Sequence, residues 1–295
     1  MKHIKLSIYL LCSLLINTSF AQLPDTDIFI ADLKKENGNW TISNTRNITE
    51  RKGYDNQPSF LKSESKVLYV SVEDDKQSDV FAFDVESGKK EQITFTTESE
   101  YSPAMSPDGK HLSVVRVDAD SSQWLYLLDR NNTVSAKKIS NSDSTGYYCW
   151  INDSSIATFV VGKPHRLQLL DLKNGRQIYI MQNPGRCMKL SPDKSQLYYV
   201  DKNDSMYWSL KSLDLSRLIS ETLFHMPDKT EDFEVLPDNS ILAGVAGRLI
   251  RRTFDESDEW RIIADLREHT GEFYRISLDA KAGLIAFVAF RGEKP

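Results

Sequence analysis

Cysteine and histidine are scarce in this chain, which has three cysteines and five histidines among 295 residues. Two cysteines, Cys149 and Cys187, lie beyond residue 21, too few for the disulfide framework of a small secreted domain. Four histidines lie there as well, at unrelated places, which argues against a histidine-centred zinc site: His111, His165, His225 and His269. The chain must therefore stabilise its fold by burying apolar surface.

Motifs of the common enzyme classes are also missing. The sequence has no Gly-x-Ser-x-Gly nucleophile elbow, no His-Glu-x-x-His and no Cys-x-x-Cys. A P-loop and a Gly-x-Gly-x-x-Gly fingerprint are absent too. We therefore expect no catalytic residues, no metal site and no cofactor.

Long apolar segments are lacking as well. The longest, Ile4–Ile16, covers about 13 residues, whereas a membrane-spanning helix needs ~20. A basic segment precedes it, and Ser19-Phe-Ala21 places small residues three and one positions before a cleavage point at Gln22. This is the plan of a secretory signal peptide, so we predict that residues 1–21 are removed. The product, residues 22–295, is then a periplasmic or secreted protein that does not span the membrane.

Positive charge is in deficit. The chain has 37 Lys and Arg against 42 Asp and Glu, a formal net charge of −5, which becomes −7 once the two lysines of the signal peptide are removed. An acidic protein is repelled by a phosphate backbone. The composition therefore excludes nucleic acid as the expected partner.

A repeat of 41 to 45 residues runs through the rest of the chain. Its clearest copy, Tyr101–Val115, consists of a strand, a Ser-Pro-Asp-Gly turn and a second strand. One apolar position marks each of six copies: Phe60, Met105, Cys149, Leu190, Val235 and Ile276. This period is typical of the four-stranded blade of a β-propeller.

The second half of each unit repeats too. Six further strands end in Asp, and a polar turn and an outer strand follow: residues 28–32, 80–84, 125–129, 167–171, 210–214 and 250–255. The N-terminal piece has only the last two strands of a unit, and the C-terminal piece has only the first two. We therefore predict one all-β domain, a six-bladed β-propeller of four-stranded blades. Its N-terminal strands complete the last blade and close the ring.

The Ser106-Pro-Asp-Gly-Lys110 hairpin and the outer strand with Gln92-Ile-Thr94 resemble those of TolB-like β-propellers with PD40 (WD40-like) repeats. The resemblance covers residues 25–291 and implies an envelope-side binding scaffold. In TolB an α/β domain precedes the propeller, and the pair works in the periplasm with an outer-membrane, peptidoglycan-associated lipoprotein. The present sequence is expected to lack that domain.

The inner strands of such a propeller surround a channel, and residues near their start should converge on its mouth. We predict a ligand-binding site there, made of Asp55, Glu100, Tyr147, Arg186, Glu231 and Arg275. Carboxylates, guanidinium groups and an aromatic ring at one opening can bind a peptide terminus, a sugar or a cation. Arg186 and Arg275 suit a carboxylate bound in bidentate fashion. The alternative is that these groups only solvate a water-filled channel.

Three other features have weaker functional interpretations. Acidic loops at residues 73–75, 118–120 and 201–204 are possible Ca²⁺ ligands, although solvated turns explain them better. Tyrosines and tryptophans on the strands are better explained by packing between blades than by a carbohydrate platform. Cys149 and Cys187 lie out of register on neighbouring inner strands, so we expect two separate buried thiols.

Together these patterns predict a monomeric, non-enzymatic scaffold that binds an envelope protein or peptide on a propeller face. One alternative stays open, a glycan- or cation-binding propeller, including a polysaccharide-processing enzyme. An enzyme should concentrate titratable groups with strongly shifted pKa values at the channel mouth.

Overall fold

The computed structural model describes residues 23–61, 64–73, 77–141, 144–255, 259–279, 281 and 283–292. The regular secondary structure of the described chain is almost entirely β-strand, with one 3-10 turn, η1 (Pro227–Lys229), and one short helix, α1 (Arg267–Thr270). No helix in this part of the chain is long and apolar enough to cross a membrane. The predicted signal peptide, residues 1–21, lies outside the described residues, as do Asp74 and Asp75 of one acidic loop.

Four sheets each contain four antiparallel strands in sequence order. The first comprises β7 (Ser99–Met105), β8 (His111–Val117), β9 (Gln123–Asp129) and β10 (Asn132–Lys138). The second comprises β11 (Thr145–Asn152), β12 (Ser155–Val160), β13 (Arg166–Asp171) and β14 (Gln177–Gln182). The third comprises β15 (Pro184–Leu190), β16 (Gln196–Asp201), β17 (Ser209–Asp214) and β18 (Ile219–His225). The fourth comprises β19 (Phe233–Val235), β20 (Ile241–Val245), β21 (Arg248–Arg252) and β22 (Arg261–Asp265).

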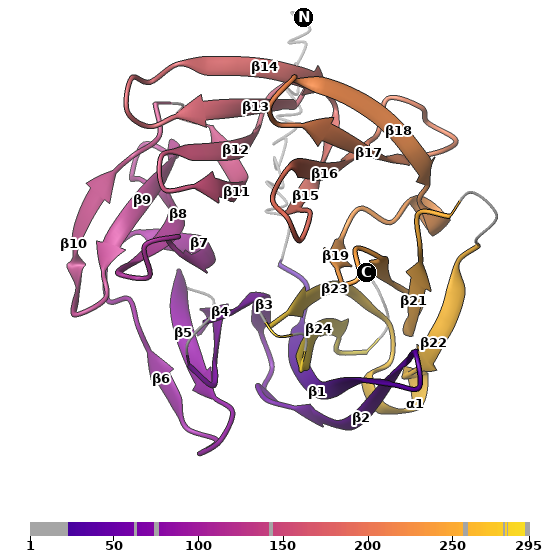
Figure 1. The fold of residues 1–295 in the computed structure, drawn as a ribbon. Coiled ribbons are helices and arrows are strands. Elements are labelled where there is room, and N and C mark those ends of the chain that lie inside the picture. The colour runs from indigo at the N-terminus through magenta and orange to yellow at the C-terminus, as the bar shows by residue number, and fades with distance from the viewer. Residues whose placement is uncertain are drawn as a thin grey trace, which may run out of the picture.

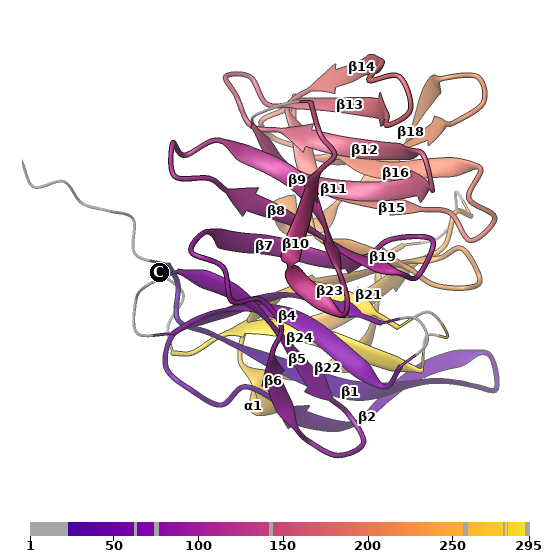
Figure 2. The same cartoon turned by 90° about the vertical axis from the view of Figure 1, so that its left-hand side faces the viewer.

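The remaining eight strands form one continuous sheet. Half of it is again four consecutive strands: β3 (Tyr54–Phe60), β4 (Lys66–Val72), β5 (Ser78–Asp84) and β6 (Lys90–Gln92). The other half combines both ends of the chain: β23 (Phe273–Leu278), β24 (Leu284–Phe290), β1 (Thr26–Glu36) and β2 (Asn39–Asn47). A single parallel pair, Thr26 with Tyr54, joins the halves. The sheets are arranged around a common centre (Figure 1), and a side view shows them as successive layers (Figure 2).

The two ends of the chain pair over a long register. β1 lies antiparallel to β24 from Thr26 opposite Phe290 to Asp32 opposite Leu284, and its other edge pairs with β2. Ile28 on β1 and Phe287 on β24 are fully buried. The sequence predicted this association of N-terminal and C-terminal strands, because each end lacked half a repeat.

The hairpin turns follow from their polar residues. In the turn after β7, the Ser106 hydroxyl donates to Asp108, and the Asp108 carboxylate accepts the backbone N–H of Lys110 at 2.9 Å. Gly109 adopts φ +69°, which favours glycine. In the turn after β15, the Ser191 hydroxyl donates to Asp193 at 2.6 Å in the same way. These turns explain why the Ser-Pro-Asp pattern marks the repeat.

The aspartates that end the third strands cap their own turns. Asp84 accepts the backbone N–H of Ser87 at 2.8 Å, and Asp214 accepts that of Ser216 at 2.9 Å. The outer strands are less regular than predicted. For example, the pairing of β10 with β9 is interrupted by a register shift between Asn132 and Ala136.

The hydrophobic core lies between neighbouring sheets. Phe159 and Leu167 of the second sheet pack in one cluster with Met188, Leu197 and Tyr199 of the third. Aromatic side chains also bridge sheets through hydrogen bonds. The Tyr148 hydroxyl of β11 donates to a neighbouring sheet at the Ser113 carbonyl, 2.7 Å away. Packing between sheets, the favoured interpretation of the aromatic residues, is confirmed at these positions.

Candidate functional site

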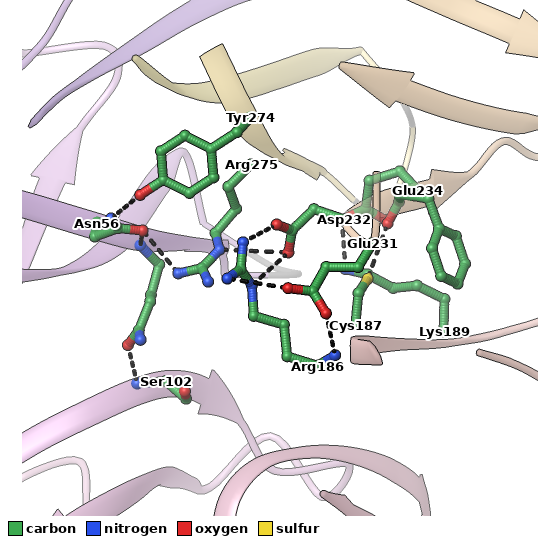
Figure 3. Close-up of polar contacts among 12 residues, drawn as sticks. Asn56, Ser102, Arg186, Cys187, Lys189, Glu231, Asp232, Glu234, Tyr274 and Arg275 are labelled. Carbon is green, nitrogen blue, oxygen red and sulfur yellow. Dashed lines mark hydrogen bonds and ion pairs between the residues drawn. The ribbon is translucent and has the colours of Figure 1, made fainter. Parts of the chain in front are cut away.

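A cavity of about 180 Å³ lies where the innermost strands of the sheets meet. Its wall includes residues of β3, β7, β11, β15 and β23, and Asp232, which immediately precedes β19. Every group of four strands therefore contributes to one small cavity. Figure 3 shows polar contacts among residues that line this cavity or lie next to it.

Asp232 joins two arginines from different sheets. Arg186 of β15 binds it in bidentate fashion, with Nε 3.3 Å from Oδ1 and Nη2 on Oδ2. Arg275 of β23 places its Nε 3.5 Å from the same Oδ1. Asp232 is 6% exposed, so these ion pairs, which Figure 3 shows, are shielded from bulk solvent.

Glu231 extends this cluster towards the surface. Its Oε1 lies 3.2 Å from Nη1 of Arg186, and its Oε2 accepts the Arg186 backbone N–H at 3.1 Å. Lys202, just after β16, donates to Oε2 at 3.1 Å. Arg275, Asp232, Arg186, Glu231 and Lys202 thus form one continuous chain of ion pairs.

Arg275 is held by neutral groups on its other side. Its Nη1 donates to Oδ1 of Asn56 at 2.7 Å, and Nδ2 of Asn56 donates to the Tyr274 hydroxyl at 2.6 Å. Its guanidinium carbon lies 5.8 Å from the ring centroid of Tyr147 and 5.9 Å from that of Tyr274. These distances suit cation–π attraction, which orients the guanidinium group.

The ion pairs fix the charges of the cluster. Burial would lower the pKa of Arg186, but the Asp232 carboxylate outweighs burial and holds that pKa above its usual range. Burial would lower the pKa of Arg275 as well, but the Asp232 carboxylate again outweighs burial and raises it. Burial would raise the pKa of Asp232, but the two guanidinium groups outweigh it and the pKa is lowered. All three groups are therefore charged near neutral pH.

A second buried pair lies beside the first. Lys189 of β15 donates to Glu234 of β19, and the Cys187 thiol donates to the Phe233 carbonyl at 3.3 Å. Burial raises the pKa of Cys187 to about 12, so the sulfur is a thiol rather than a nucleophilic thiolate. Cys149 and Cys187 are both thiols, as predicted, but both residues are half-buried rather than fully buried.

Four of the six predicted site residues come together here: Tyr147, Arg186, Glu231 and Arg275. Asp55 and Glu100 do not line the cavity. Both are completely buried and have local partners. Asp55 accepts from Nη2 of Arg51 at 2.8 Å, and Glu100 accepts from the Thr96 hydroxyl.

Sequence reasoning missed several residues of the cluster, above all Asp232, Asn56 and Tyr274. Each is adjacent in sequence to a predicted residue. The innermost strands carry register shifts, for example between Asn56 and Ser59 in β3 and between Phe273 and Arg275 in β23. Such irregularities break the alternation of side chains that would have shown which neighbour faces the cavity.

Glu100 nevertheless makes a testable contribution to stability. One carboxylate oxygen, Oε2, is buried without a hydrogen-bond partner among the described residues, and burial raises the pKa of Glu100 from 4.5 to about 7. The folded state therefore holds this proton more tightly than the unfolded state. The resulting stability is present below pH 4.5 and is lost as the pH rises to about 7.

We expect the Glu100→Gln variant to lack this decline, because glutamine resembles the protonated acid. At pH 8 it should unfold with a free energy up to about 3 kcal/mol higher than the wild type, and near pH 4 the two should be similar. Denaturant unfolding across this pH range measures the difference. Glu221→Gln, at an exposed position of β18, is the control and should follow the wild type. Parallel pH profiles for wild type and Glu100→Gln would contradict the prediction.

The acidic loops are engaged in local contacts. The Asp118 carboxylate accepts from the Tyr126 hydroxyl at 3.0 Å, and Asp204 accepts the backbone N–H of Met206 at 2.7 Å. Among the described residues, no group of three or more His, Cys, Asp or Glu is placed to hold a metal ion. Whether Ca²⁺ binds this chain stays a prediction.

The sheets, their strand order and their shared central cavity define a β-propeller fold, and it is of the TolB-like type. A putative TolB from Agrobacterium tumefaciens has a similar structure, with a TM-score of 0.71 and 10% sequence identity over 92% of this chain and 99% of that one. TolB from Acinetobacter baumannii gives a TM-score of 0.58 at 14% identity, over 90% of this chain and 63% of its own.

An enzyme has a similar fold as well. An oligogalacturonate lyase in complex with manganese gives a TM-score of 0.51 at 14% identity, over 92% of this chain and 99% of that one. No family model and no curated protein sequence matches the chain. At these identities the similarities establish the fold and leave the activity to be argued from the site.

Proposed function

We propose that this protein is a non-enzymatic scaffold of the cell envelope that binds a protein or peptide around the mouth of its central channel. The observation that carries the proposal is the cavity at the meeting point of the innermost strands, where Arg275 is 12% exposed. Its Nη2 atom makes no hydrogen bond to a described residue. A rigid, charged wall with an unused donor suits recognition of a polar group on a partner.

The propeller architecture supports this proposal in finer detail. We propose six blades, with the eight-stranded sheet counted as two, and a ring closed by the β1–β24 pairing; the four four-stranded sheets and the pairing of the chain ends support this. We propose a single domain over residues 22–295, exported to the periplasm or secreted after cleavage of residues 1–21, and monomeric. The TolB neighbours are consistent with an envelope location and a protein partner.

Titratable groups with shifted pKa values do gather at the cavity, as expected for an enzyme, but the shifts carry these groups away from neutral pH and so favour binding over catalysis. A general acid or base needs a pKa near the working pH. Here the pKa values of Arg186 and Arg275 are raised, that of Asp232 is lowered, and the Cys187 thiol titrates only at about 12. Glu100, whose pKa is about 7, does not line the cavity.

Affinity purification from envelope extract, followed by direct titration of the recovered partner, tests the proposal. We expect Arg275→Gln to weaken partner binding at least about tenfold, which corresponds to 1.4 kcal/mol. Arg248→Gln is the matched control, because Arg248 forms an exposed pair with Asp265 and should leave affinity unchanged. Equal affinity of the wild type and Arg275→Gln would move the binding site away from the channel.

The alternative function is a glycan- or cation-binding propeller, including a polysaccharide-processing enzyme. The observation in its favour is the fold shared with an oligogalacturonate lyase whose structure contains manganese. Thermal unfolding in the presence of oligogalacturonate, Ca²⁺ or Mn²⁺ distinguishes the two functions. Specific stabilisation by one of these probes, without a protein partner, would favour the alternative.

A further inference from the structure

The central cavity has a particular chemical preference, and its unused hydrogen-bonding groups show it. Besides Nη2 of Arg275, the Tyr147 hydroxyl has no hydrogen bond to a described residue. The Gln57 side chain accepts the backbone N–H of Ser102 through Oε1 at 2.5 Å, which leaves its Nε2 as an unused donor. The Ser102 hydroxyl is buried without a partner among the described residues.

These four side chains come from β3, β7, β11 and β23 and line the same cavity. Each of them can donate a hydrogen bond. The unused atoms of Arg275 and Gln57, Nη2 and Nε2, are donors only and cannot accept a hydrogen bond. A buried hydroxyl without a partner costs about 1–3 kcal/mol unless something satisfies it. A ligand that accepts hydrogen bonds would satisfy those donors of the set that face the cavity.

The charge of the wall points in the same direction. The continuous ion-pair chain contains three cations, Arg275, Arg186 and Lys202, and two carboxylates, Asp232 and Glu231. It therefore carries one uncompensated positive charge. Arg186 already uses Nε, Nη1 and Nη2, whereas Arg275 keeps Nη2 available. One singly charged anion at Arg275 would neutralise this chain of ion pairs.

The size of the cavity limits what can enter. About 180 Å³ is below the ~300–1,000 Å³ of pockets that enclose drug-sized ligands, so it accommodates the end of a larger ligand rather than a whole one. The rest of the wall includes apolar side chains of Pro58, Pro103, Met188 and Ile276. An aliphatic side chain next to a carboxylate fits such a wall better than a sugar ring, whose hydroxyls would need polar partners.

From these observations we infer that the cavity binds the C-terminal carboxylate of a peptide, with Arg275 as the charged partner. Nη2 of Arg275, Nε2 of Gln57 and the hydroxyl of Tyr147 donate to the carboxylate. The last side chain of the peptide lies against the apolar wall. This inference rests on the proposed binding function and adds the chemical group that is recognised.

The test compares two forms of one probe on the wild-type protein. Acetyl-Ala-Ala-Leu with a free C-terminal carboxylate is titrated calorimetrically beside the same peptide with a C-terminal carboxamide. The carboxylate form should bind at least about tenfold more tightly, which corresponds to 1.4 kcal/mol. Because this comparison needs no variant, it does not depend on how any substitution folds. Equal binding of the two forms, or no binding of either up to about 10 mM, would overturn the inference.

Variants then show which side chains cause the preference for the carboxylate form. Arg275→Gln should remove the preference for the carboxylate form, Tyr147→Phe should reduce it by loss of one donor, and Arg248→Gln should leave it unchanged. Galacturonate is the second probe. If galacturonate binds through Arg275 and the peptide does not, the carboxylate belongs to a glycan, and the inference is wrong.

The outcomes also separate this inference from the proposed function. A protein partner that needs Arg275, but binds equally well when its C-terminus is amidated, would overturn the inference and leave the scaffold function standing. A partner that ignores Arg275 would contradict both.

Discussion

Replacing Asp232 with alanine is expected to lower the free energy of unfolding by about 3–5 kcal/mol. The Asp232 carboxylate is buried between Arg186 and Arg275, with Oδ1 3.3 and 3.5 Å from their respective Nε atoms. Its removal leaves two guanidinium groups next to each other in a shielded site. They would then repel each other and lack the partner that offsets their desolvation. Denaturant unfolding at neutral pH measures the loss.

Asp265→Ala is the matched control for this substitution. Asp265 also contacts two arginines, with Oδ2 2.6 Å from Arg267 and 3.3 Å from Arg248, but its side chain is exposed. Exposed ion pairs contribute only about 0–1 kcal/mol, because water and salt screen them. Both aspartates pair with two arginines, so the difference between the two losses of unfolding free energy reports the effect of burial rather than the number of ion pairs. A similar loss in both variants would show that the pairs of Asp232 are screened as well.

The parts of the fold that were predictable from the sequence are those determined by local chemistry. A Ser-Pro-Asp turn carries its own hydrogen bonds, as Ser106 and Asp108 show, so its sequence is tied to its shape. The aspartates at the ends of the third strands, such as Asp84, cap turns of their own. Because these features recur at a fixed period, they predicted the strands and the association of the chain ends. Positions of irregular outer strands were less predictable.

The site was only partly predictable, because its geometry depends on which side chains of the inner strands face the centre. Asp55 and Asn56 are neighbours on β3, yet Asn56 contacts Arg275 whereas Asp55 is buried against Arg51. A register shift follows immediately in that strand, between Asn56 and Ser59. Asp232 lies just before β19 begins, where no strand periodicity applies. Only the folded arrangement brings such residues to one cavity.

The pairing of the chain ends makes the second prediction with a large effect. Phe287 of β24 is fully buried, opposite Phe29 of β1 on one side and Ile276 of β23 on the other. Its ring centroid lies 4.8 Å from that of Phe273. The side chain also belongs to a cluster with Leu242 and other residues of the fourth sheet. Phe287→Ala should therefore lower the free energy of unfolding by about 3–5 kcal/mol through lost burial and the cavity that remains.

Two further variants show whether the paired chain ends unfold together with the rest of the fold. Tyr179→Ala, at a position of β14 that is 58% exposed, should change stability by no more than about 0.5 kcal/mol. Phe159→Ala removes a buried ring between the second and third sheets, far in sequence from the chain ends, and should cost about as much as Phe287→Ala. If the pairing of β1 with β24 closes one cooperative ring, both core variants should unfold in a single transition. A second transition that appears only in Phe287→Ala would show instead that the sheet formed by the two ends opens independently of the rest.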